Sequence, residues 1–258
     1  MEGVADKNSS ARDTLLEIIS SHGLNRQFSI HLVHKHFNLA EGKVMVYETV
    51  RGPNHPDYML CSPQNPEKYN NIQGLYYQVC LDGTMAAYEY TTDSIQDISK
   101  YSEFVAEFAV AVLRLGVKDV FALTAKQPET KRFSEFELSD LCSTILVANP
   151  SWLPNTAGNS TSTDWISSAS IGPHIRNDER KKDGIITLTD CTKTTSGGHY
   201  NFTCSKTRDG THYQQKPATW EDNGGKVQEQ LFLDGELVPV DSEPFIIINS
   251  ARKIIECS

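Results

Sequence analysis

Two histidines separated by one residue, His34 and His36, have the type and spacing most suited to chemistry in this chain. They lie in FSIHLVHKHF, which is followed by NLAEG and then by KVMVYETV. β-Branched and aromatic residues on both sides favour strands, and the middle has the composition of a turn. The pattern therefore predicts a β-hairpin over residues 28–50.

Alternation along the first strand of this hairpin decides where the histidines point. Successive side chains on a strand face opposite sides, so His34 and His36 share one face and His31 lies on the other. The shared face is otherwise apolar, and pairing across the loop adds Glu48 to it. We therefore expect His34 and His36 to point into the protein and His31 to be exposed to solvent.

Three interpretations of the histidine pair remain open. In the first, His34, His36 and Glu48 bind a metal ion; two imidazoles and one carboxylate suit Zn or Fe, with positions left for water or substrate. In the second, one imidazole is a general base and the other donates a hydrogen bond to a substrate. In the third, backbone carbonyls or Glu48 satisfy both imidazoles, which have only a structural role. A more distant metal ligand would come from His174, His199 or His212.

The first two interpretations predict a small-molecule enzyme, in the first case metal-dependent, with its site on the inward face of the 28–50 hairpin. A proline-rich loop around His55 and a segment containing Trp152 and Trp165 would cover this site. The alternative from another class is a non-catalytic protein that binds a ligand or interacts with another protein.

Short resemblances accompany the histidine pair. His34-x-His36, followed by four residues and Glu41, is similar to the first ligand motif of the cupin family, although its flanking glycines and a second motif are absent. Over roughly the first fifth of the chain, the helix and the strand that ends in His-Lys-His-Phe resemble a group of uncharacterised proteins of filamentous fungi. That resemblance implies a cytoplasmic protein and transfers no activity.

The wider pattern predicts an α+β fold with a largely antiparallel sheet built from hairpins and about three to four helices. Helices are expected from near Ser10 to Gly23, over Glu103–Leu115, and after a capping box at Ser134. Asp82-Gly83 marks the clearest hairpin, and the last 80 residues are mostly β, including PFIIIN at 244–249. We expect a single α+β domain over 1–258. Residues 150–171 would form an internal loop or the boundary between an α+β half and a mostly β half.

Composition narrows the class of partner. A formal charge of −9 argues against nucleic-acid binding, which needs clustered Lys and Arg. No run approaches the roughly 18 apolar residues of a membrane span, and the polar N-terminus predicts an intracellular, cytoplasmic protein. A small molecule is the expected partner. Six scattered cysteines are expected to be free thiols: Cys61, Cys80, Cys142, Cys191, Cys204 and Cys257.

Overall fold

The computed structural model of the 258-residue chain describes most of its first two-thirds and parts of the remainder. The described residues are 3–125, 133–148, 150, 152, 161–167, 181–182, 185–191, 202–207, 228–233 and 236–256. All structural statements below refer to these residues.

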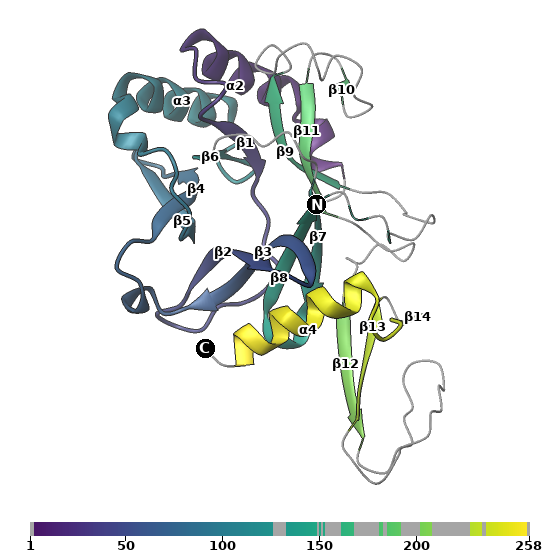
Figure 1. Cartoon of the computed structure of the whole chain (residues 1–258). Helices are drawn as coiled ribbons and strands as arrows, with labels where there is room; N and C mark the ends of the chain where they lie inside the picture. Colours follow the sequence, from purple (N-terminus) through teal and green to yellow (C-terminus); the bar gives the residue numbers. More distant parts are fainter. Residues whose placement is uncertain are drawn as a thin grey trace.

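The elements follow one another as an α+β chain (Figure 1). The α-helices are α1 Val4–Lys7, α2 Ser9–Ser21, α3 Ser102–Leu115 and α4 Glu243–Glu256, and the short 3-10 helices are η1 Pro66–Lys68, η2 Ile98–Tyr101 and η3 Ser139–Leu141. The strands are β1 Ser29–Leu32, β2 Val44–Gly52, β3 His55–Gln64, β4 Gln73–Val79, β5 Met85–Thr91, β6 Phe121–Thr124, β7 Phe133–Leu138, β8 Ser143–Ala148, β9 Thr161–Ser167, β10 Lys181–Lys182, β11 Ile185–Cys191, β12 Phe202–Thr207, β13 Gln228–Leu233 and β14 Glu236–Leu237.

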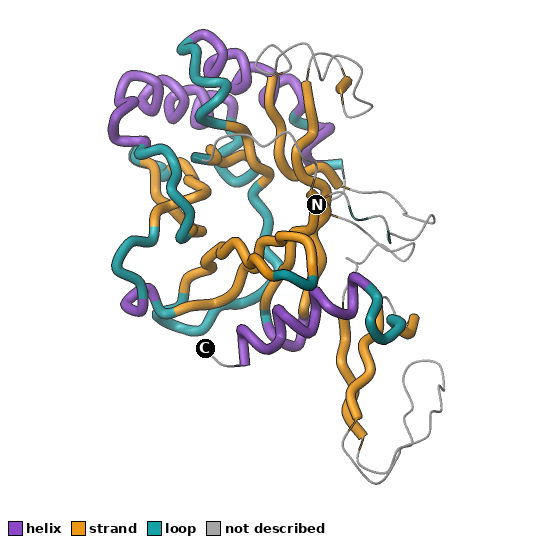
Figure 2. The backbone as a smooth tube through the Cα atoms, viewed as in Figure 1, coloured by secondary structure: helices purple, strands orange, loops and turns teal. Residues whose placement is uncertain are grey.

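Eleven strands form one curled sheet in the order β10-β11-β7-β8-β3-β2-β5-β4-β6-β1-β9. Strand β9 also pairs with β11, so the order closes on itself and ten strands form a continuous ring. Figure 2 shows these strands arranged around a common centre. A closed ring gives the sheet an inner face, on which side chains from distant parts of the sequence meet.

The sheet is mixed, which corrects the expectation of a sheet built only from antiparallel hairpins. Two pairings are parallel, β2 with β5 and β11 with β7, and the other pairings among the described strands are antiparallel. The hairpin at Asp82-Gly83 is confirmed, since β4 and β5 pair antiparallel and Gly83 adopts φ +83° in the turn. A residue with a side chain rarely adopts this φ, so the glycine is required there.

The predicted hairpin over 28–50 is wrong. Strand β1 pairs with β6 on one side and β9 on the other, while β2 pairs with β3 and β5. Both edges of β1 are therefore occupied by strands far away in the sequence. Residues 33–43 consequently connect β1 to β2 without regular structure, and they carry His34 and His36.

Two of the expected helices are confirmed and cover one part of the sheet. Helix α2 buries Leu15, Leu16, Ile18 and Ile19, and α3 ends at Gly116, which adopts the left-handed φ of +69°. The two helices lie together beside β1 (Figure 1). Their apolar faces form one core with Phe28, which precedes β1, and with the β1 and β6 side chains Ile30, Leu32, Phe121 and Leu123.

The helix expected after Ser134 is instead the antiparallel pair β7–β8. The sequence FSEFEL alternates as a strand does, and STILVA is rich in β-branched residues. Between the strands, Cys142 takes a positive φ of 48° and the Ser143 hydroxyl donates to the Leu141 carbonyl. The apparent helical stripe of leucines and isoleucine thus spans two strands and a turn.

The strand expected at PFIIIN is also wrong, because these residues begin helix α4. Proline suits the first turn of a helix, because backbone N–H groups there have no acceptor within the helix and the missing N–H of proline costs nothing. Pro244 is the second residue of α4, after Glu243. Ile247, Ile248 and Ala251 have helical spacing and pack on Tyr58, Leu60, Phe136, Leu138, Ile145 and Val147 of the sheet. Figure 1 shows α4 lying across β3 and β8.

Strands also occupy two segments expected to be irregular. The stretch around His55 contributes β3, which pairs with β2 and β8 despite Pro56 and Pro63, so it is not a loop over the histidines. Within 150–171, Thr161–Ser167 forms β9 and buries Trp165. Among the described residues, no helix has the length and hydrophobicity that a membrane crossing requires.

Replacing isoleucines in α4 tests the helical packing. Ile247→Ala and Ile248→Ala should each lower the free energy of unfolding by about 2–4 kcal/mol, because both side chains are fully buried. Ile246→Ala is the matched control and should cost clearly less, since Ile246 is only partly buried. Urea denaturation measures all three. A strand would bury 246 and 248 together, so a large loss at these two and a small one at 247 would contradict the helix.

Candidate metal centre

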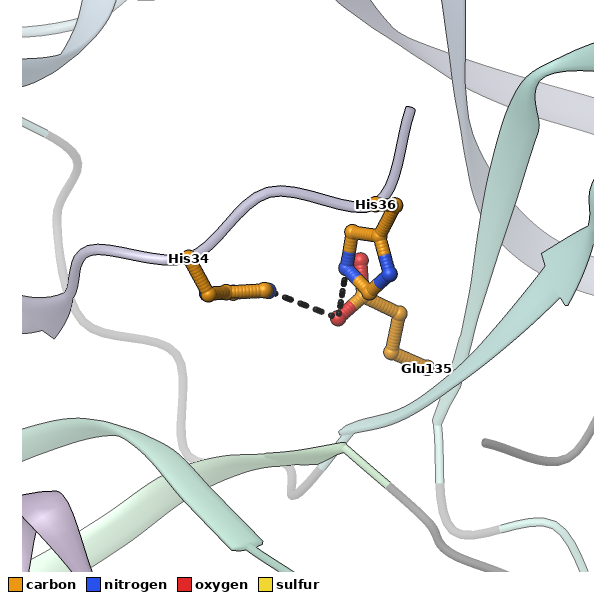
Figure 3. Close-up of side chains that lie close together, drawn as sticks. All are labelled: His34, His36 and Glu135. Atoms are coloured by element: carbon orange, nitrogen blue, oxygen red, sulfur yellow. Dashed lines mark ion pairs between the residues drawn. The ribbon is translucent and has the colours of Figure 1, made fainter. Parts of the chain in front are cut away.

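His34 and His36 lie on the connection between β1 and β2, and both imidazoles point inward (Figure 3). Only 6% of the His34 side chain and 10% of the His36 side chain is exposed. Lys35, between them, is exposed. The two rings meet edge to face with their centroids 4.7 Å apart. The connection thus places two histidine nitrogens side by side in the interior.

The carboxylate beside them comes from Glu135 on β7, whose side chain is 4% exposed. Its Oε2 atom lies 3.4 Å from Nε2 of His34 and 3.4 Å from Nε2 of His36. The three potential ligand atoms lie within 4.8 Å of one another. Among the residues that the structure describes, this is the group of three side chains with the geometry to hold a metal ion.

The other ring nitrogens fix which atoms face Glu135. Nδ1 of His34 lies 2.8 Å from the Leu32 carbonyl, and Nδ1 of His36 lies 2.7 Å from Oε1 of Glu137. Because a carbonyl and a carboxylate only accept, each Nδ1 carries the proton and donates. A neutral imidazole then presents a lone pair at Nε2. Metal-binding histidines usually have this arrangement, in which an acceptor behind the ring sets its tautomer and orientation.

The distances from the two Nε2 atoms to Glu135 are longer than those from the Nδ1 atoms to their acceptors. Charge-assisted N–H···O bonds are about 2.7–2.9 Å long, as at Glu137, and the bond to the Leu32 carbonyl is 2.8 Å long, whereas both distances to Glu135 are 3.4 Å. Around a tetrahedral ion with bonds of about 2.1 Å, neighbouring ligand atoms are about 3.4 Å apart. The spacing to Glu135 therefore suits ligands of one ion better than direct hydrogen bonds.

Without a metal, protons hold this group together. Burial alone would lower the pKa of His36, but the neighbouring carboxylates of Glu135 and Glu137 raise it from 6.5 to about 10. Burial would likewise lower the pKa of His34, but the neighbouring carboxylate of Glu135 raises it overall. Burial would raise the pKa of Glu135, yet the two imidazolium charges hold it well below 4.5. The carboxylates therefore stabilise a positive charge among these three side chains.

His31 contradicts the expectation of an exposed side chain. It is 4% exposed, and its Nδ1 lies 2.9 Å from Oδ2 of buried Asp164 on β9. Both faces of β1 are buried, one under helices α2 and α3 and the other inside the ring of strands, so alternation does not bring any β1 side chain to solvent. All three histidines of the 31–36 segment are therefore in the interior.

The remaining residues considered from the sequence lie elsewhere. Glu48, on β2, is half-buried and interacts with Tyr69; burial raises its pKa. Glu41 is exposed. His174, His199 and His212 lie outside the described residues.

Glu135 and Glu137 were missed because the sequence around them was interpreted as a helix. The signal was present in FSEFEL, where the two glutamates stand two residues apart and so share one face of a strand. Comparison of the chain with protein-family models, curated proteins and solved structures finds no significant match. The function must therefore be argued from the site.

Removing His31 tests its burial. His31→Ala should lower the free energy of unfolding by about 3–5 kcal/mol, because Asp164 would remain as a buried carboxylate without its imidazole partner. His22→Ala is the matched control and should cost less than about 1 kcal/mol, since His22 pairs with an exposed Glu107. Chemical denaturation compares the two. Equal, small effects would contradict the buried pair.

The raised and lowered pKa values predict how the stability of chelator-treated protein depends on pH. The raised pKa of His36 contributes stability that is complete below pH 6.5 and is lost as the pH rises through about 10. The lowered pKa of Glu135 contributes stability that is present above pH 4.5 and is lost in stronger acid. The unfolding free energy, measured with EDTA, should therefore decline between pH 7 and 10. His36→Gln should flatten this decline, and a parallel decline in the variant would refute the assignment.

Proposed function

We propose that this chain is a metal-dependent protein acting on a small molecule, with Zn²⁺ or Fe²⁺ bound by His34, His36 and Glu135. Two imidazoles and a carboxylate are ligands that both ions accept. Glu135 takes the place that the sequence alone had given to Glu48.

One observation carries the proposal. Each imidazole has its Nδ1 occupied by a hydrogen-bond acceptor, which turns both Nε2 atoms toward the same oxygen of a buried carboxylate. A buried lone pair that faces an anion is unfavourable unless a cation lies between them. A divalent ion would satisfy all three atoms at once and leave the imidazoles neutral.

Three protein ligands support catalysis better than a purely structural role for the metal. Structural zinc sites are usually closed by four protein ligands, whereas catalytic sites keep a position open. An ion held here would act as a Lewis acid toward an oxygen atom of a small molecule. Glu137 would keep His36 oriented, and the Leu32 carbonyl would do the same for His34.

Metal analysis of the purified protein tests the proposal. We expect about one Zn²⁺ or Fe²⁺ ion per chain after gel filtration. This metal content should depend most strongly on the three ligand residues. His34→Ala, His36→Ala and Glu135→Gln should each lower the metal content at least tenfold, because each removes a third of the protein ligands. Far-ultraviolet circular dichroism checks that each variant remains folded.

Two histidine controls separate ligand loss from a general effect of mutation. His22→Ala and His55→Ala should retain full metal content, since both residues lie outside the three-ligand group. A wild-type protein that takes up no Zn²⁺ or Fe²⁺ after dialysis against either ion would refute the proposal. The cluster would then be an ion-pair network held by protons, with only a structural role.

A further inference from the structure

Away from the three proposed metal ligands, helix α4 places a serine beside a histidine. Ser250 lies in the second half of α4, and its hydroxyl oxygen is 3.4 Å from Nε2 of His55, the first residue of β3. The two residues are 195 positions apart in the chain and meet because α4 lies across β3 (Figure 1). A serine within reach of an imidazole has the composition of a nucleophile and its base.

The other side of the imidazole determines what Nε2 can do. Nδ1 of His55 lies 2.9 Å from the Pro56 carbonyl oxygen. Because a carbonyl only accepts, Nδ1 carries the proton and donates. Nε2 of the neutral ring therefore presents a lone pair to the Ser250 hydroxyl, which donates to it. A general base needs this arrangement, in which a third group orients the ring and the nitrogen that faces the nucleophile carries no proton.

Two neighbours on the strands hold the His55 ring in this position. Gly52 pairs with His55 at the turn between β2 and β3, and a Cβ atom at position 52 would lie only 2.5 Å from Nε2. The imidazole therefore occupies the space that a side chain at this position would take. The ring of buried Tyr58 lies 5.2 Å from the imidazole, centroid to centroid. The strands thus orient the base before any substrate binds.

The Ser250 hydroxyl is placed differently from that of another serine in a helix. The hydroxyl of Ser20, in α2, lies 2.9 Å from the Leu16 carbonyl one turn earlier, as helix serines commonly do. The hydroxyl of Ser250 faces His55, and both residues are partly exposed, so a small molecule can reach the pair from solvent. Their separation is looser than a full hydrogen bond, as nucleophile–base pairs often are before a substrate binds.

We propose that Ser250 is a nucleophile that takes an acyl group from a carboxylic ester, with His55 as its general base. A bond forms between Oγ of Ser250 and the carbonyl carbon of the ester, while the hydroxyl proton passes to Nε2 of His55. The bond from the carbonyl carbon to the alcohol oxygen then breaks, and Nε2 returns the proton to this oxygen. The products are an acylated serine, the free alcohol and a neutral imidazole. Neither residue belongs to the three-ligand group, so this activity does not depend on the proposed function.

The probe for this reaction is p-nitrophenyl acetate, whose alcohol product, p-nitrophenol, is coloured. A metal-bound hydroxide would also attack this ester, so the full-length protein is first treated with EDTA. The protein should release p-nitrophenol faster than buffer alone does. Mass spectrometry of peptides from protein quenched in acid during the reaction should find an acetyl group on Ser250 and none on Ser20.

Variants separate the roles of the two residues. Ser250→Ala should lose the release of p-nitrophenol, and His55→Ala should slow it about a hundredfold, which is the size of a general-base effect. Gly52→Ala should slow it about tenfold or more, because the added Cβ atom displaces the His55 ring while Ser250 remains. His22→Ala is the matched control and should not change the rate, since His22 pairs with Glu107.

A purely structural contact between α4 and β3 would give a different pattern. A rate of release that Ser250→Ala leaves unchanged would overturn the inference, and the pair would then only fasten the helix to the strand. Loss of release in Ser250→Ala with a normal rate in His55→Ala would overturn the assignment of the base. If Ser250→Ala fails to fold, the acid-quenched wild type decides: an acetyl group on Ser250 supports the inference, and its absence overturns it.

Discussion

The buried carboxylate of Glu135 is the constraint on which the interior of this protein depends. A carboxylate that is removed from water must be paired, and here two imidazoles face the same oxygen at 3.4 Å. The acceptors behind the rings prevent the imidazoles from turning away. Whatever positive charge lies among these atoms, whether protons or a metal ion, holds the β1–β2 connection against strand β7.

The closure of the sheet creates this constraint. Strand β9 pairs with both β1 and β11, which joins the two ends of the sheet and gives it a protected inner face. Glu135 and Glu137 project from β7 on this face, and His34 and His36 approach from a connection that belongs to neither neighbouring strand of β7. Residues about 100 positions apart thus meet, as the His36–Glu137 contact shows. Helices α2 and α3 share one apolar core with the sheet, and α4 shares another.

The parts of the fold that depend on neighbours in sequence could be predicted. Helices α2 and α3 have helical apolar stripes and glycines beyond their ends, and the β4–β5 hairpin has an Asp-Gly turn. The errors arose where distant partners decide the structure. Strand β1 pairs with β6 and β9 instead of folding back on β2, and β7–β8 becomes two strands because both find partners in the ring.

The candidate site could be predicted only in part, for the same reason. His-x-His spacing singled out His34 and His36, but no local pattern joins them to Glu135, which is 99 residues beyond His36. His31 was expected to be exposed because side chains alternate along a strand and one face is often exposed to solvent. In this closed sheet both faces of β1 are buried, and His31 forms a hydrogen bond with Asp164 instead.

Anomalous diffraction from crystals of the zinc-loaded protein, recorded on both sides of the zinc absorption edge, tests the central claim most directly. The account predicts one anomalous peak at about 2.0–2.2 Å from Nε2 of His34, Nε2 of His36 and Oε2 of Glu135. Both Nδ1 atoms should keep their contacts to Leu32 and Glu137. Zinc bound elsewhere, with Glu135 hydrogen-bonded directly to the two imidazoles, would contradict the account.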